Sequence, residues 1–332
     1  MTSPISALIP TNFSGVVHVT RDDVVLHSQA YGFADRANQR PNRVDTRFGT
    51  ASAGKALVAV GIMRLVADGQ LKLNATIGDL LTLDLRAIDP TITVRQLLNH
   101  TSGIPDYFDE SVMDEYADLF VDFPNYRIRT STDIVPLFID KPMTTTPGEV
   151  FAYNNTGYVV LGLVIEAVTG LPFDKYLQAA VFDPAGMALS GYFELDRLPG
   201  NCANAYLEDG ATNIYSVDAK GTGAGGAFLT ADDVVRFWDA LTSGVLLPAD
   251  LVREMHTTQA SEIADDGDIT RYGYGFWLGG DTGEVPAFMG EDPGVAFMTS
   301  RGTDRLTTVV VSNQGDDVWE IHSAIREALS DD

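Results

Sequence analysis

Ser52 and Lys55 are the first residues whose types and spacing could carry covalent chemistry. On a helix, side chains three positions apart lie on one face, so the amine of Lys55 can reach the Ser52 hydroxyl. The following run, residues 56–63, is apolar nearly all round, which predicts a buried helix. Burial would lower the pKa of Lys55 and favour its action as a base. Taken alone, the pair fits a helix-capping serine and a snorkelling lysine equally well.

A second candidate for chemistry is the segment Tyr153-Asn154-Asn155. A phenol held near a lysine loses its proton more easily and can relay it to a leaving group. The amide of Asn155 can hold a lysine in place and donate to a substrate carbonyl. Taken alone, the segment is a turn before the apolar helix predicted over residues 159–168.

Strands near both chain ends and helices between them must position these residues. Strand-forming runs occur over residues 13–19, 24–31, 272–278, 295–298 and 306–312. The capping-box spacings of Thr93 with Gln96 and Thr230 with Asp233 predict two helix starts. Apolar residues at helical spacing predict a last helix over 318–329.

These elements predict an α+β fold. One antiparallel sheet is built from both chain ends and flanked by helices, and a mainly helical lobe is inserted into it. We expect residues 1–64 and 266–332 to form the sheet lobe and residues 65–265 the helical lobe. The active site is then expected in the cleft between the two lobes.

Three segments in this order resemble the serine β-lactamase and penicillin-binding-protein superfamily, in its class C-like branch. They are Thr50-Ala51-Ser52-Ala53-Gly54-Lys55, Leu97-Leu98-Asn99-His100-Thr101-Ser102-Gly103-Ile104, and Pro147-Gly148 leading to Tyr153-Asn154-Asn155. That branch includes esterases, D-amino-acid amidases and aminopeptidases, and D-alanyl-D-alanine carboxypeptidases. Further similar stretches extend the resemblance over nearly the whole chain.

The resemblance implies a role for each matching residue. Ser52 would be acylated, and its backbone N–H would be half of an oxyanion hole. Lys55 would accept the serine proton, and Tyr153 would protonate the leaving group and activate the deacylating water. Asn155 would position the substrate and Lys55. The choice between Lys55 and Tyr153 as the main base stays open.

One motif departs from the superfamily pattern. The third motif is Lys-Thr-Gly, or His-x-Gly in the esterase-like branch, and its best-placed match here is Phe288-Met289-Gly290. Phe288 cannot hold a substrate carboxylate as a basic residue does, and the following Glu291 and Asp292 would repel a carboxylate or attract an amine. We expect Phe288, Gly290 and Glu291 at substrate-binding positions. A neutral ester or an amine-bearing amide then fits better than a β-lactam.

Composition excludes several classes of partner. The chain has 46 acidic and 22 basic residues and a net charge of −24, which disfavours nucleic acid and membrane surfaces. Its start lacks the features of a signal peptide and no segment approaches ~20 apolar residues, so we expect a cytoplasmic protein. No histidine has metal-ligand spacing. We expect no metal and no cofactor, and a small-molecule ester or amide as the partner.

The leading hypothesis is therefore a serine hydrolase that cleaves a small ester or amide through an acyl-enzyme on Ser52. A D-amino-acid amidase or aminopeptidase, and a D,D-peptidase or β-lactamase, are alternatives within the same class. A non-catalytic binding or scaffold relative is the alternative from another class, and Phe288 is its main support. Retention of Ser52, Lys55, Tyr153 and Asn155 together favours the enzyme.

Overall fold

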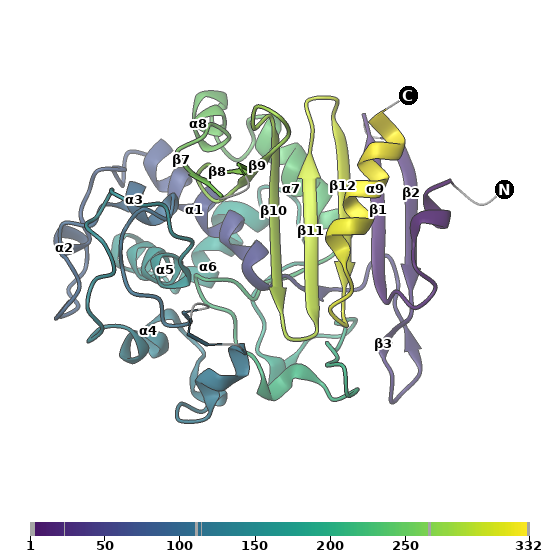
Figure 1. Cartoon of the computed structure of the whole chain (residues 1–332), viewed down its shortest axis with the longest axis horizontal. Coiled ribbons are helices and arrows are strands. Elements are labelled where there is room, and N and C mark those ends of the chain that lie inside the picture. Colours follow the sequence, from purple (N-terminus) through teal and green to yellow (C-terminus); the bar gives the residue numbers. More distant parts are fainter. Residues whose placement is uncertain (1–3, 23, 110–111, 114, 265–266, 331–332) are drawn as a thin grey trace.

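The first strand of the chain pairs with the last strand, and the second strand pairs with the first at the edge of the same sheet. In the computed structural model, which describes residues 4–22, 24–109, 112–113, 115–264 and 267–330, eight antiparallel strands form one sheet in the order β2-β1-β12-β11-β10-β9-β8-β7 (Figure 1). They are β1 (Gly15–Arg21), β2 (Val24–Tyr31), β7 (Ala260–Ile263), β8 (Ile269–Tyr272), β9 (Trp277–Gly279), β10 (Val285–Asp292), β11 (Val295–Arg301) and β12 (Leu306–Ser312). Short two-stranded sheets join β3 (Phe33–Asp35) to β4 (Arg40–Pro41) and β5 (Phe48–Gly49) to β6 (Phe228–Leu229).

Helices cover both faces of this sheet. On one face, α9 (Val318–Ser330) lies across β11 and β12 and contacts the 3-10 turn Pro4–Leu8 (Figure 1). On the other face, α7 (Ala231–Thr242) packs on β1 and β12. Side chains alternate along β1, so Val17 and Val19 enter the core under α9 and Val16 enters the core on the α7 side.

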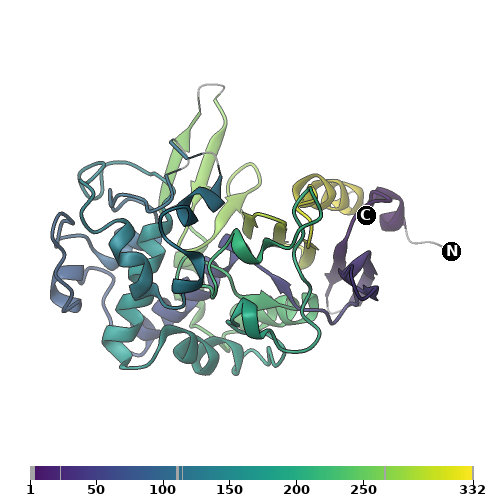
Figure 2. The ribbon, with the colours of Figure 1, turned by 90° about the horizontal axis from the view of Figure 1, so that it is seen from below.

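The remaining helices pack beside the sheet, where α1 and α5 are the central pair (Figures 1 and 2). Both are apolar on nearly every side, which matches their burial. They are α1 (Lys55–Ala67), α2 (Ile77–Leu80), α3 (Val94–Leu98), α4 (Ser131–Ile134), α5 (Asn155–Thr169), α6 (Phe173–Leu177) and α8 (Ala249–Met255). A π-helical turn, Gln178–Phe182, continues α6 and contacts α1.

The fold confirms the predicted α+β class and the sheet built from both chain ends. The expected strand over 272–278 is instead two strands, β8 and β9, because the chain turns between them at Gly275, whose φ is +83°. A Cβ at Gly275 would lie 2.4 Å from the Ala59 Cβ of α1, so only glycine fits there. The division into lobes at residues 64 and 265 stays a prediction, and β7 joins the sheet from within the stretch expected to be helical.

The helices were compared with the length and hydropathy that a membrane-spanning helix needs. Over the described part of the chain, no single helix is long and apolar enough to cross a bilayer. The segments Asn155–Thr169 and Phe173–Phe182 pass the test only when they are joined, and they bend by 77° where they meet.

Candidate active site

Ser52 lies in a 3-10 turn, Ala51–Gly54, that leads directly into α1. Ala51 has a φ of +46°, an uncommon conformation for a residue with a side chain. Gly225 and Gly226 pass close to this turn, and a Cβ on Gly225 would come within 2.3 Å of the Ala51 carbonyl oxygen. The Gly226 N–H donates to that same oxygen at 3.0 Å. These contacts hold Ser52 at the start of the buried helix that the sequence predicts.

Lys55 is buried next to Ser52, with only 2% of its surface exposed. Its Nζ lies 2.8 Å from Ser52 Oγ, 2.7 Å from Asn155 Oδ1 and 2.7 Å from the Ala224 carbonyl oxygen. The amide and carbonyl oxygens can only accept hydrogen bonds, so Lys55 donates to both. The same nitrogen is within proton-transfer distance of the Ser52 hydroxyl.

Tyr153 stands beside this amine. The centroid of its ring lies 5.0 Å from Lys55 Nζ. The ring stacks on Trp277 of β9, with centroids 5.5 Å apart and an interplanar angle of 19°, and it also contacts the His100 ring at 4.5 Å. Contacts with two rings restrict the orientation of Tyr153 next to Lys55.

His100 joins this aromatic group as a neutral ring. It is 1% exposed, and its Nδ1 accepts from the backbone N–H of Asn154 at 3.1 Å, which places the ring proton on Nε2. Burial holds the pKa of His100 well below its usual value, and the charge of Lys55 acts in the same direction. His100 therefore supports the Tyr153-Asn154 backbone and adds no positive charge to the site.

Asn155 is the first residue of α5, and two side chains hold this helix start. Asn154 Oδ1 accepts from the N–H of Gly157 at 2.8 Å. The carboxylate of Asp106 accepts from the N–H groups of Asn155 at 2.7 Å and Thr156 at 3.2 Å. These bonds satisfy donors that the helix itself leaves unpaired, and a negative charge is favourable at this end.

Gly290 lies on β10 against the turn that carries Ser52. A Cβ at Gly290 would come within 2.4 Å of the Ser52 nitrogen and 2.5 Å of the Ala53 nitrogen. Glycine is therefore required for β10 to approach the turn this closely. The next residue, Glu291, is exposed and lines the cavity described below.

Phe288 does not lie where the sequence analysis expects it. Its side chain is 2% exposed. The centroid of its ring lies 5.2 Å from that of Trp238 and 5.5 Å from that of Phe237, both in α7, and 5.9 Å from that of Phe297 in β11. It is not among the residues that line the cavity at Ser52. Phe288 is a core residue in this structure, and its expected contact with substrate has no structural support.

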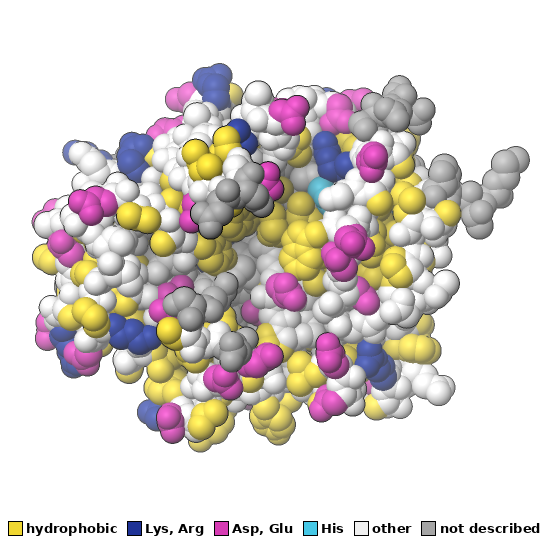
Figure 3. All heavy atoms as spheres, viewed as in Figure 1, with side chains coloured by type: hydrophobic (Ala, Val, Ile, Leu, Met, Phe, Trp, Pro, Cys, Tyr) yellow, Lys and Arg dark blue, Asp and Glu magenta, His cyan; other side chains and the backbone are white. Residues whose placement is uncertain are grey.

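A cavity of about 960 Å³ opens at Ser52. Figure 3 shows this face of the molecule, with a hollow between the helical part and the sheet and acidic side chains near it. The lining combines the candidate nucleophile with polar, aromatic and acidic groups, including Ser52, Tyr107, Tyr116, Asn155, Asp218, Glu291 and Asp292.

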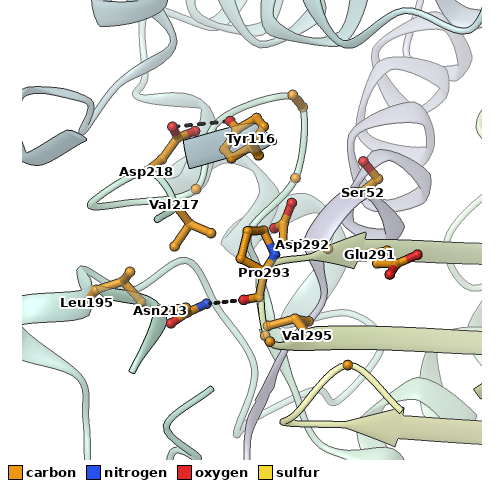
Figure 4. Close-up of a pocket in the computed structure, with 18 of the residues that line it drawn as sticks. Ser52, Tyr116, Leu195, Asn213, Val217, Asp218, Glu291, Asp292, Pro293 and Val295 are labelled. Atoms are coloured by element: carbon orange, nitrogen blue, oxygen red, sulfur yellow. Dashed lines mark hydrogen bonds between the residues drawn. The ribbon is translucent and has the colours of Figure 1, made fainter. Parts of the chain in front are cut away.

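Two carboxyl groups, those of Asp218 and Asp292, line one side of this cavity. Figure 4 shows Asp292 between Ser52 and the pair formed by Tyr116 and Asp218, in which the tyrosine hydroxyl donates at 3.3 Å. Burial raises the pKa of Asp218 to about 8, with the charge of Asp292 adding to the effect. Burial also raises the pKa of Asp292 to about 7, against the opposite effect of Lys55. Glu291 points away from both in the same view.

Of the residues chosen from the sequence, the structure brings Ser52, Lys55, Tyr153 and Asn155 together, places Gly290 and Glu291 beside them, and leaves Phe288 in the core.

Sequence reasoning missed Asp106, Tyr116, Asp218 and the carbonyl of Ala224. Asp106 follows the quoted segment 97–104 by two positions, which could have drawn attention to it. Tyr116 begins the 3-10 turn Tyr116–Phe120, and Asp218 and Ala224 lie in loops; the approach of these segments to Ser52 has no local signal. Across the described residues, no group of three His, Cys, Asp or Glu side chains could hold a metal ion.

Comparison with known proteins gives the family. The model of the beta-lactamase family matches residues 11–329. The solved structure of a penicillin-binding protein from Bacillus halodurans has a TM-score of 0.91 and 38% sequence identity, covering 98% of this chain and 100% of that one. D-amino acid amidase from Ochrobactrum anthropi SV3, solved with D-phenylalanine, has a TM-score of 0.77 and 25% identity, covering 98% of each chain.

A curated relative agrees with these structural matches. Esterase EstB from Burkholderia gladioli is 29% identical over 280 residues, which is 75% of this chain and 71% of that protein. The resemblance inferred from the ordered motifs is thereby confirmed. Because the family match extends over nearly the whole chain, this protein belongs to the beta-lactamase family, within the superfamily of serine β-lactamases and penicillin-binding proteins, and the family is one of serine hydrolases.

Proposed function

We propose that this protein is a serine hydrolase that cleaves a small ester or amide through an acyl-enzyme on Ser52. The observation that carries the proposal is the position of Lys55 Nζ, 2.8 Å from Ser52 Oγ and held by Asn155 and Ala224. An amine in this position can take the serine proton as the nucleophile attacks. The open cavity at Ser52 leaves room for a substrate to approach.

The reaction then has two stages. Ser52 Oγ bonds to the substrate carbonyl carbon while its proton passes to Lys55, directly or through Tyr153. The carbon–oxygen or carbon–nitrogen bond breaks, and the leaving alcohol or amine takes a proton from the same groups. A water molecule next attacks the acyl-enzyme, releases the acid and returns the proton to Ser52. The backbone N–H of Ser52 stabilises the developing oxyanion.

Substrates without a carboxylate near the scissile bond suit this cavity best. Asp218 and Asp292 lie on one side of it, where burial already raises both pKa values, so a substrate carboxylate would place a further negative charge in a region that disfavours it. An ammonium group would instead stabilise the ionised forms of both residues. This favours a neutral ester, with an amine-bearing amide as the second candidate. The similarity to an esterase and to a D-amino acid amidase supports the same two classes.

Covalent labelling tests the nucleophile. After incubation with a fluorophosphonate, intact-protein mass spectrometry should show one adduct on the wild-type chain and none on Ser52→Ala. Lys55→Met should label far more slowly, because the serine loses its proton acceptor. An equal adduct on Ser52→Ala would reject Ser52 as the nucleophile. No adduct and no turnover on the wild-type chain would favour a non-catalytic relative.

A substrate panel tests the class of substrate. It contains p-nitrophenyl esters, D- and L-aminoacyl nitroanilides, and a chromogenic cephalosporin. We expect turnover of an ester or an aminoacyl compound and negligible turnover of the cephalosporin. Asp292→Asn should lower kcat/KM for the aminoacyl compounds more than for uncharged esters. Fast cephalosporin turnover would contradict the argument from the acidic cavity.

A further inference from the structure

Asp106 contacts the candidate site through one of its two carboxylate oxygens. Its Oδ2 accepts from the backbone N–H of Asn155 at 2.7 Å and from the side-chain Nδ2 of the same residue at 3.3 Å. Its Oδ1 accepts from the N–H and the hydroxyl of Thr156, each at 3.2 Å. The Thr156 hydroxyl itself accepts from the N–H of Tyr107 at 2.9 Å, so its proton is available to Asp106. Asp106 is therefore surrounded by donors, which favour its ionised form.

This arrangement decides which end of the Asn155 amide faces Lys55. A carboxylate only accepts hydrogen bonds, so the NH₂ group of Asn155 must turn toward Asp106. The amide oxygen then turns toward Lys55, where it accepts from Nζ at 2.7 Å. If the amide were reversed, two acceptors would face each other at Asp106 and two donors would face each other at Lys55. Asp106 therefore fixes the orientation of the Asn155 side-chain amide, with its oxygen toward Lys55.

The orientation of the amide has a consequence for Ser52. Lys55 Nζ donates to the Asn155 oxygen and to the Ala224 carbonyl, which have no proton to return. A proton shared between Nζ and Ser52 Oγ, by contrast, can move in either direction over the 2.8 Å contact. A reversed Asn155 amide would compete with Ser52 for the nitrogen of Lys55.

We propose that Asp106 is a positioning residue of this site, which acts through Asn155 to aim Lys55 at Ser52. The inference rests on the proposed function, because it assigns Asp106 a role in the acylation of Ser52. A purely structural role as a cap of α5 is the competing explanation, since the same carboxylate satisfies the first N–H groups of that helix.

Asp106 also contributes charge to the site. The groups that face Lys55 and can change charge are Tyr153, Tyr158, His100, Asp106 and Asp292. Burial raises the pKa of Asp106, while its hydrogen bonds and the charge of Lys55 act in the opposite direction. Loss of a nearby negative charge makes proton release easier for both candidate bases, Lys55 and Tyr153. The acidic limb of the pH profile should then move to lower pH when Asp106 loses its charge.

Three single variants test the proposal against helix capping. Asp106→Asn should lower kcat for an ester by about 100-fold with little change in KM, and move the acidic limb to lower pH. Asp106→Glu, which keeps the charge but displaces it, should lose kcat without moving that limb. Thr156→Val is the matched control, because it removes a bond to the other carboxylate oxygen at the same helix start. It should keep most of kcat even where it lowers Tm.

A double-mutant cycle tests whether Asp106 acts through Asn155. In the Asn155→Ala background, Asp106→Asn should cause little further loss in the rate of Ser52 phosphonylation or in kcat. Additive losses, or a kcat for Asp106→Asn equal to that of Thr156→Val, would overturn the proposal. If Asp106→Asn fails to fold, Asp106→Glu in the same cycle decides the question. Absence of Ser52 labelling in the wild-type chain would instead reject the proposed function itself.

Discussion

The carboxyl of Asp218 illustrates how the cavity changes the behaviour of a single residue. Burial raises its pKa from 3.8 to about 8, so the folded protein holds this proton more tightly than the unfolded chain does. Between those two values, each rise in pH reduces the contribution of Asp218 to the free energy of unfolding, by at most about 1.4 kcal/mol per pH unit. Above about pH 8 the contribution no longer changes.

Asp218→Asn should therefore alter the pH dependence of stability. The amide cannot lose a proton, so the variant should gain stability relative to the wild-type chain when pH rises from 5 to 8.5. Urea unfolding at several pH values measures the difference. Asp209→Asn, at an exposed aspartate of the same cavity, is the control and should show no such trend. A constant difference between Asp218→Asn and the wild-type chain across this range would contradict the assignment.

At the scale of elements, the site depends on how closely β10 approaches the turn before α1. The two are joined at Gly290, where the backbone of the strand lies against the backbone nitrogens of Ser52 and Ala53. Neither the strand nor the turn can shift easily, because β10 is paired with β11 and the turn continues into a buried helix. The position of Ser52 therefore depends on a contact between two elements that are far apart in the sequence.

Gly290→Ala should separate these elements. The added methyl group would meet backbone atoms at 2.4–2.5 Å, so the strand or the turn must shift. We expect at least a tenfold loss in the rate of fluorophosphonate labelling, on the basis that a shift of about 1 Å can cost about 100-fold. Gly200→Ala, with open space around its Cβ position, is the control and should label at the wild-type rate. Labelling of Gly290→Ala at that rate would show that the contact is unimportant.

At the scale of the whole molecule, the excess of negative charge governs the response to salt. A net charge of −24 produces repulsion across the surface of the folded chain. Dissolved salt screens this repulsion, and the screening length falls from about 30 Å at 0.01 M to about 8 Å at 0.15 M. The folded state should therefore be more stable against unfolding when salt is present.

We expect Tm to rise by a few degrees as NaCl increases from 0.01 to 0.15 M. Differential scanning calorimetry across this range measures the effect, and sucrose at matched osmolality serves as the control for a general solute effect. A Tm that stays constant or falls in NaCl would show that ion pairs such as Arg129 with Asp196 outweigh the general repulsion.

Short-range patterns predicted much of the site. Ser52 and Lys55 lie one turn apart because helical geometry is local, and the apolar run after them requires burial wherever the chain folds. The strands at both ends and the capping box at Thr93 were predictable for the same reason, because each depends on neighbouring residues. The order of the motifs then indicated the family.

Tertiary structure alone decided which groups surround this pair. Phe288 and Asp292 lie four positions apart on one strand, yet Phe288 packs under α7 while Asp292 lines the cavity, because β10 leaves the core between them. Asp106 reaches Asn155 from a distant loop, and Ala224 contributes only a backbone oxygen. The sequence by itself determined the nucleophile candidate and its helix. The orientation of Lys55 and the acidity of the cavity arise from contacts between segments that no local pattern connects.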